Sequence, residues 1–413
     1  MKRIAAIALV FGCLEGRGDQ GEAMESESEA ESEGETGFLY VWAGPRRAGD
    51  GLDKPPGNDV LVTVDLATRR AVAVLDVDSA NNEPHHVMRC GARLFAGGLF
   101  SGRIFIFDVS QPETPTLEAT LEGAEAGLGV ADDFLCLPDG RVLVTMMGSD
   151  TGQSPGGLIE IAPDLTIGDA WPATPPPDLN PHGIDVDLAG GRLVTTDLME
   201  LASVASDPPA PVVRSTVRIW DLDSHEITDT VEVCTGPMEA RFFPNDPQGR
   251  ILVCCMVAGE FGVVSRDSTG AYRYDASLDI DGADDLVASP GGIHLAGNTL
   301  WVALSGYGEV RRYDLDDPLA PTPSGTAIVG SGAHYMTFDD GAGSGARGYV
   351  SDYTVQRLEI VTGMSAPDLR VWRFDAETEW MVSEVVMDFG PSGEDALLAD
   401  RLPLQPHGIA LGE

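Results

Sequence analysis

A short pattern recurs along most of the chain, and it limits the fold more than any other feature. Each copy begins with a Pro-His step, or a close equivalent, that leads into a short apolar strand. A second strand follows a basic or glycine turn, and a third ends in an aromatic-Asp-apolar sequence. The first full copy runs from Glu83-Pro84-His85-His86 to Phe107-Asp108-Val109. Repeats of about 50 residues, each with three or four short strands, predict a β-propeller.

The two ends of this repeat array complement each other. The strands that begin at Phe38, Val60 and Ala71 have no Pro-His step before them, whereas the last copy has only the step and one strand. We therefore expect residues 406–411 to join the sheet of the first three strands, because closing the ring removes two exposed sheet edges. The sequence predicts an all-β fold, a seven-bladed β-propeller closed by its C-terminal strand.

The first residues of the copies are expected to meet near the axis, because the first strand of each propeller blade is innermost. Five of the seven histidines in the chain lie at or next to this register, and we interpret His225 and His294, which do not, as structural. The aligned positions are His85, Asp132, His182, Met238, Gly291, His334 and His407, followed one step later by His86, Asp133, Glu239 and Tyr335.

This gathering of side chains predicts a metal site. Imidazoles with a thioether suit copper, and imidazoles with carboxylates suit zinc, iron or copper. Nearby carboxylates can orient ring nitrogens from outside the ligand set. The alternative is that each histidine only bonds a neighbouring carbonyl group and that the carboxylates are solvated. The predicted metal ligands are His85, His86, His182, His334 and His407, and the predicted second layer or substrate contacts are Glu83, Asp132, Met238 and Glu239.

The charge of the chain excludes one class of partner. With 66 acidic and 26 basic residues, the formal net charge is −40. Such a surface repels phosphate backbones, so we expect no nucleic-acid binding.

The N-terminal region is expected to lie outside the propeller. Residues 1–13 combine a basic start with a short apolar run and end in Val10-Phe11-Gly12-Cys13, which is similar to a bacterial lipobox with Cys13 as the lipidated residue. The alternative is plain secretion. Residues 14–37 are Ser/Glu-rich and predict a disordered tether, and residues 38–413 form the propeller. We therefore expect an extracytoplasmic protein, in the periplasm or at the outer membrane, with a lipid anchor as its membrane contact.

The six cysteines contain no CxxC motif, which argues against a zinc site built from paired thiolates. Cys254 and Cys255 are adjacent in an apolar run, so one is expected to face each side of a strand. The cysteines beyond Cys13 are interpreted as buried small side chains, or as disulfides whose pairing the spacing does not reveal.

Three segments resemble the selenium-binding protein / methanethiol oxidase family. They are Asn82-Glu83-Pro84-His85-His86 with the strand after it, Val217-Arg218-Ile219-Trp220-Asp221 with Glu239-Ala240-Arg241-Phe242-Phe243, and Gly308-Glu309-Val310-Arg311-Arg312-Tyr313-Asp314. The resemblance implies a seven-bladed propeller and, for its oxidase members, copper-dependent conversion of a small thiol, methanethiol, to formaldehyde, hydrogen sulfide and hydrogen peroxide. It implies that His85 and His86 are catalytic.

The chain also departs from the family pattern. Asp132-Asp133 replaces a His-rich step before Cys136-Leu137, Ala43 replaces a cysteine proposed to bind selenium, and the turn at Gly306-Tyr307-Gly308 lacks a family histidine. The alternative to an oxidase is therefore a non-catalytic propeller that binds a small ligand or a protein at the cell envelope.

Overall fold

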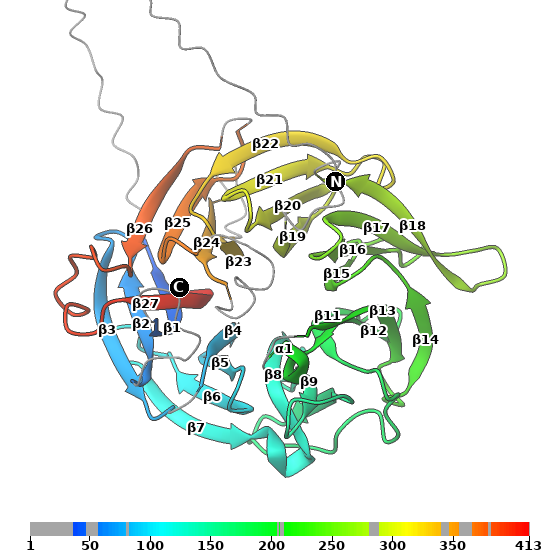
Figure 1. Cartoon of the computed structure of the whole chain (residues 1–413), viewed down its shortest axis with the longest axis horizontal. Helices are drawn as coiled ribbons and strands as arrows, with labels where there is room; N and C mark the ends of the chain where they lie inside the picture. The colour runs from blue at the N-terminus through cyan, green and yellow to red at the C-terminus, as the bar shows by residue number, and fades with distance from the viewer. Residues whose placement is uncertain are drawn as a thin grey trace, which may run out of the picture. The chain divides into compact units, whose positions relative to one another are not determined.

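The seven predicted blades are present as seven antiparallel sheets arranged in a ring (Figure 1). The computed structural model describes residues 36–46, 57–79, 82–204, 206, 210–280, 289–339, 347–354, 366–378 and 381–412. Within these ranges, six sheets have four strands and one has three. The predicted all-β, seven-bladed propeller is confirmed.

Each of the first four blades runs from an innermost strand outward to the rim of the ring. Blade 1 contains β27 (Leu404–Gly412), β1 (Phe38–Pro45), β2 (Asp59–Asp65) and β3 (Arg70–Val77). Blade 2 contains β4 (Pro84–Cys90), β5 (Arg93–Gly98), β6 (Arg103–Asp108) and β7 (Thr116–Glu122). Blade 3 contains β8 (Leu128–Cys136), β9 (Val142–Ser149) and β10 (Gly157–Ile161). Blade 4 contains β11 (Pro181–Asp187), β12 (Arg192–Glu200), β13 (Val212–Asp221) and β14 (Ile227–Glu232).

The remaining blades follow the same order. Blade 5 contains β15 (Pro237–Phe242), β16 (Ile251–Cys255), β17 (Glu260–Arg266) and β18 (Tyr272–Asp279). Blade 6 contains β19 (Pro290–Ala296), β20 (Thr299–Leu304), β21 (Glu309–Asp314) and β22 (Thr322–Ile328). Blade 7 contains β23 (Ala333–Asp339), β24 (Arg347–Asp352), β25 (Arg370–Asp375) and β26 (Ser383–Asp388). The short helices η1 (Gly123–Ala126) and α1 (Leu201–Val204) lie between strands.

The ring closes as predicted. Strand β27 pairs with β1 in antiparallel register, with Ile409 opposite Val41 and Gly408 opposite Trp42. In Figure 1 the red β27 lies beside the blue strands of blade 1. The two ends of the propeller therefore share one sheet, and β27 covers the inner edge of β1.

The core consists of apolar layers between neighbouring blades. The side chains of Leu39, Val41 and Ala43 pack toward blade 7, while those of Tyr40 and Trp42 pack toward blade 2. Successive side chains of a strand point to opposite faces, so a strand buried on both faces must be apolar throughout. This explains the continuous apolar runs that the sequence shows at each blade.

Two disulfides are present, so of the two interpretations of the cysteines beyond Cys13 the disulfide one holds for four of them and the one as small buried side chains is wrong for those four. Cys90–Cys136 joins blades 2 and 3, and Cys234–Cys255 lies in the region where blade 4 leads into blade 5. Cys254 stays a buried free thiol and faces the opposite side of β16 from Cys255, as expected.

Most of the predicted N-terminal region lies outside the described residues. This applies to the signal sequence with Cys13 and to the tether up to residue 35. The first strand of the structure begins at Phe38. Among the described residues, no helix combines the length and the apolar character needed to cross a membrane.

Candidate metal centre

The same backbone irregularity occurs in all seven inner strands, at the step where the sequence pattern begins. The pairing register shifts between Pro84 and Val87 in β4, and at corresponding places in β8, β11, β15, β19, β23 and β27. In β4, His85 and His86 together lie opposite the single residue Gly97. Such a β-bulge breaks the alternation of side chains. Both histidines can therefore face the axis.

The five predicted histidines come together on this axis. Ring nitrogens of these histidines and oxygens of nearby carboxylates form three groups of possible metal-ligand atoms, which we call donor groups. Within each group the atoms lie within 4.8 Å of one another. His86 belongs to all three groups. The groups are His85, His86, Asp132 and His182, then His86, His334 and His407, and then His86, Asp133 and Glu239.

Hydrogen bonds orient the imidazoles around His86. His407 Nδ1 lies 2.9 Å from the carbonyl oxygen of Pro84 and 3.0 Å from His85 Nδ1. His182 Nδ1 lies 3.0 Å from the carbonyl oxygen of Met238 and 3.3 Å from Asp132 Oδ2. The sequence left open that each histidine only bonds a neighbouring carbonyl group. In His182 and His407 one ring nitrogen does so. A histidine held in this way presents its other nitrogen to a metal.

Many polar atoms in this cluster have no hydrogen-bond partner. Within the described residues, eleven buried side-chain nitrogen and oxygen atoms make no hydrogen bond of good geometry, and seven of them belong to His85, His86, Asp132, Glu239 and His407. Four of these seven atoms still face an ion-pair partner: His85 Nε2 lies against Asp132 Oδ1, Asp132 Oδ2 against His182, and Glu239 Oε2 against Arg241. The other three atoms belong to His86 and His407. Both nitrogens of His86 are among them, and its Nδ1 lies 3.7 Å from Asp133 Oδ1. A buried polar atom without a partner is costly, and a bound cation would remove that cost. The residues present therefore fit a metal ion.

Burial keeps most of these imidazoles neutral. It lowers the pKa of His182 to about 4, and it lowers the pKa values of His85, His334 and His407 well below the usual range. Burial acts on His86 in the same direction, but Asp132, Asp133 and Glu239 outweigh it and raise the pKa of His86. Neutral imidazoles have the lone pairs that metal ligation requires.

The carboxylates in the cluster outnumber the cations. Asp132 is fully buried, and Asp133 and Glu239 are nearly so. Burial raises the pKa of Glu239 to about 7, although the nearby Arg241 acts in the opposite direction. The guanidinium of Arg241 lies 2.7 Å from Glu239 Oε2. One guanidinium against three carboxylates leaves a negative site, which favours a cation.

Two residues at the site were not found from the sequence. The ring of Tyr353, which follows β24, stacks on His407 with 3.4 Å between centroids, and its hydroxyl donates to Glu83 Oε1 at 3.2 Å. Glu83 therefore lies behind the histidines, in the second layer. Arg241 is two residues after Glu239 on β15, so period-two alternation along the inner strand could have indicated it.

The other predicted positions divide clearly. Asp132 and Glu239 are themselves members of donor groups, whereas Met238 contributes its carbonyl oxygen and packs its side chain into an apolar cluster. His225 stacks on Trp171 and His294 on Phe338, and both lie outside the donor groups.

The Arg241–Glu239 pair gives a prediction for the metal-free protein. Replacing Arg241 with methionine should lower the free energy of unfolding by about 3 kcal/mol at pH 8, because it leaves the buried carboxylates without their cation. The loss should be smaller at pH 5. Without Arg241 the folded-state pKa of Glu239 rises further above its unfolded value, and stability then falls as pH rises through that range. Urea unfolding at both pH values measures this.

The controls for Arg241 are one exposed pair and one double variant. Arg273→Met breaks an ion pair with Asp275 in which 60% of the Arg273 side chain is exposed, so it should change stability by less than about 1 kcal/mol. Arg241→Met combined with Glu239→Gln should recover part of the loss. An Arg241→Met protein with equal deficits at both pH values would contradict this assignment of charge.

The fold and this site together define a class: a seven-bladed β-propeller with a buried histidine–carboxylate site on its axis. Residues 77–349 match the family of the 56 kDa selenium-binding protein (SBP56). The chain belongs to this family, as the resemblance in the sequence indicated.

Curated relatives agree with this family, and a solved structure agrees with the fold. The chain is similar to methanethiol oxidases from Hyphomicrobium sp. and Homo sapiens, at 26% and 22% identity over 70% and 66% of its length. These alignments span 69% and 66% of the two relatives, and one with the mouse methanethiol oxidase spans 55% of that protein. A hypothetical selenium-binding protein from Sulfolobus tokodaii superposes with a TM-score of 0.72 at 16% identity, covering 91% of this chain and 93% of that one.

A further solved structure shows the fold alone. The periplasmic gluconolactonase PpgL of Pseudomonas aeruginosa superposes with a TM-score of 0.61 at 13% identity, covering 92% of this chain and 99% of that one.

Proposed function

We propose that this protein is a copper-dependent oxidoreductase that acts on a small thiol, as methanethiol oxidases do. The observation that carries the proposal is the meeting of the five predicted histidines around His86, where both ring nitrogens of His86 and Nε2 of His407 are buried without a hydrogen-bond partner among the described residues. Imidazole nitrogen is a suitable ligand for copper. The relatives that bear the name methanethiol oxidase supply the substrate class.

In this proposal, copper is held by nitrogens of His85, His86, His182, His334 and His407, with Asp132 beside them. Bound copper would favour the thiolate form of the substrate and take up its electrons. The protein's own part is to keep four of the imidazoles neutral and to exclude water, since His85, His86, His182 and His407 are at most 5% exposed. His85 and His86 then contact the reacting atoms.

Glu239 is the proposed acceptor of the thiol proton. Its carboxylate shares a donor group with His86, and burial raises its pKa to about 7. A base with a pKa near the working pH is best suited to accept a proton and release it again. Arg241, 2.7 Å away, would hold this carboxylate in position.

The proposed reaction converts methanethiol, oxygen and water to formaldehyde, hydrogen sulfide and hydrogen peroxide, and its atoms and electrons balance. We also propose an extracytoplasmic location, with Cys13 as the lipid-anchored residue. The two disulfides support this location because such bonds persist in oxidising compartments.

Metal analysis combined with product analysis tests the proposal. Protein expressed in copper-supplemented medium should contain copper, and with methanethiol it should release sulfide, peroxide and formaldehyde in equal amounts. Protein without a transition metal would overturn the oxidase assignment. Copper without these products would leave the metal centre and reject the thiol substrate.

Selenium binding by a thiol finds no support at the position that the family resemblance indicated. Ala43, fully buried in β1, has no sulfur. The free thiol Cys254 is also buried, and burial raises its pKa well above the usual value, so it is a poor nucleophile. A non-catalytic role would therefore have to use the histidine site.

A further inference from the structure

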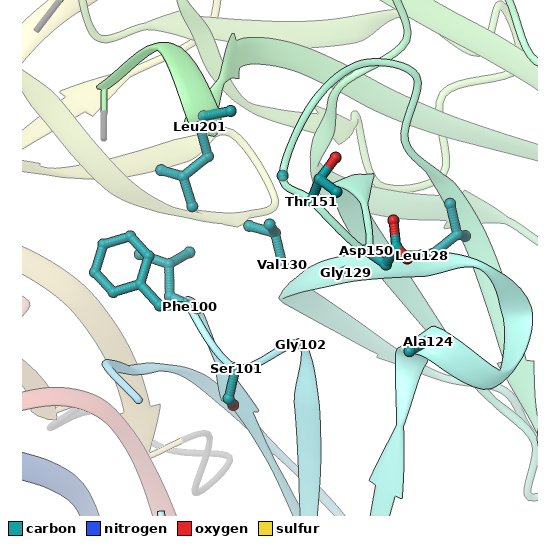
Figure 2. A pocket seen from close by; sticks show the side chains of 13 residues that line it. Phe100, Ser101, Gly102, Ala124, Leu128, Gly129, Val130, Asp150, Thr151 and Leu201 are labelled. Carbon is teal, nitrogen blue, oxygen red and sulfur yellow. The ribbon is translucent and has the colours of Figure 1, made fainter. Parts of the chain in front are cut away.

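A small pocket opens where turns of blades 2 and 3 meet α1, which follows β12 of blade 4. It has a volume of about 160 Å³ and is lined by the turn after β5, the start of β8, the turn after β9, and α1. Figure 2 shows Phe100, Leu201 and Val130 gathered on one side of it, and the turn with Asp150 and Thr151 on the other.

The wall of this pocket continues into the apolar layer next to the histidines. Leu99, Val130 and Leu201 line the pocket and belong to one buried cluster with Met238. The carbonyl oxygen of Met238 lies 3.0 Å from His182 Nδ1. Val130 is also two residues before Asp132 on β8. Apolar side chains of a single cluster therefore separate the pocket from the candidate ligands.

On the side of blade 2, a backbone hydrogen bond connects the pocket to the strand that carries His85. The amide of Leu99 donates to the carbonyl oxygen of Glu83 at 2.9 Å, and Glu83 is two residues before His85. The pocket is therefore tied to the backbone on both sides of the first donor group, at His85 and at Asp132.

The lining determines what the pocket can bind. None of its thirteen lining residues is basic, and Asp150 is the one with a charge. An anion would therefore find no counter-charge there, and the net charge of −40 would repel it. The lining combines apolar side chains such as Phe100 and Leu201 with Ser101, Thr151 and turn backbone. Its volume of about 160 Å³ is similar to that of a cavity that takes benzene or a xenon atom. The volume of the pocket and the absence of a basic lining residue favour a small, uncharged molecule with an apolar part.

We propose that this pocket is the first binding site of the substrate and that it admits short alkyl thiols in their protonated form. Thiols that carry a carboxylate are rejected by charge, and long alkyl thiols are rejected by size. The proposal rests on the proposed function for the identity of the reacting group, but the binding itself requires no metal. Specificity is thus set at the pocket, before the thiol loses its proton at the histidines.

Crystals of the metal-free protein test the binding step without any turnover. Xenon under pressure and ethanethiol should each give density in the pocket, and mercaptoacetate should give none. Ala202→Phe places a ring in the pocket from α1 and should abolish the xenon density. The matched control is Ala189→Phe, which adds the same ring at an exposed turn after β11 and should leave it unchanged. Absence of xenon and ethanethiol, or binding of mercaptoacetate, would overturn the pocket assignment.

Kinetics of the copper-loaded protein test the path. Ala202→Phe should raise KM for methanethiol about tenfold with little change in kcat, because the ring hinders entry of the thiol through the pocket and leaves the histidine site unchanged. Phe100→Ala, at a side chain that is 45% exposed, widens the pocket and should raise kcat/KM for butanethiol relative to methanethiol. If Ala202→Phe excludes xenon yet leaves KM unchanged, the pocket is not on the path. If xenon and ethanethiol bind but no thiol is oxidised, the binding site stands and the oxidase assignment fails.

Discussion

A protein in which His86 is replaced by alanine should bind copper at least about 100-fold more weakly than the wild type and should purify without it. His86 is the one side chain shared by all three donor groups, and both of its ring nitrogens are buried without a hydrogen-bond partner within the described residues. Changing residues that only orient ligands already costs about 10- to 100-fold in metal affinity, and loss of a shared ligand should cost more. Copper content per chain and a competition titration with a chelator measure the effect.

Two controls separate loss of the ligand from loss of the fold. His225→Ala removes an imidazole that stacks on Trp171 at 3.5 Å, away from the axis, and should keep copper binding intact. Metal-free His86→Ala should still unfold cooperatively in urea, with a midpoint lowered by the cavity that the buried ring leaves and by the loss of its interaction with Asp133. A His86→Ala protein that keeps its copper would show that the metal lies elsewhere.

The ring could be predicted from the sequence because each blade repeats the same local chemistry. The Pro-His step and the aromatic-Asp strand end mark where each blade begins and where its third strand stops. The lone strand at Gln405-Pro406-His407-Gly408 supplied the missing inner strand of blade 1. Blade 3 has three strands, and isolated bridges from Leu158 to Trp171 and from Ile161 to Ile167 stand where its outer strand would be.

The alignment of the repeats also predicted that the histidines lie close together, but it did not predict how their rings are arranged. Regular strands place successive side chains on opposite faces, so His85 and His86 would be expected to diverge. Their rings instead stack with centroids 4.4 Å apart, because the bulge in β4 places both opposite Gly97. Bulges depend on pairing between strands, and a single sequence does not specify where the pairing slips.

The repeat pattern did not predict which side chains of different blades contact each other. Tyr353 belongs to blade 7 and Glu83 to blade 2, and only the closed ring brings the hydroxyl to the carboxylate. The disulfide between Cys90 and Cys136 instead joins neighbouring blades, at the far ends of two inner strands that are 46 residues apart. Neither pair shows a spacing that distinguishes it from other pairs.

Removal of residues 404–413 should prevent the protein from folding into a stable ring. The deletion takes away β27, exposes the inner edge of β1 and removes His407 from the donor groups. It also uncovers one side of the apolar layer between blades 1 and 7, in which Leu404 and Ile409 are 1% exposed. Total stabilities of folded proteins are only about 5–15 kcal/mol, so loss of a whole inner strand exceeds what the fold can tolerate. We expect an insoluble or protease-sensitive product.

A point variant tests the same closure in a protein that still folds. Ile409→Ala should lower the free energy of unfolding by about 2–5 kcal/mol, because it leaves a cavity between the first and last blades. The matched control is Ile328→Ala at the end of β22, where the isoleucine is 63% exposed and the change should be within about 0.5 kcal/mol. Equal effects of the two substitutions, or a truncated protein that unfolds with the wild-type midpoint, would show that β27 does not close the ring.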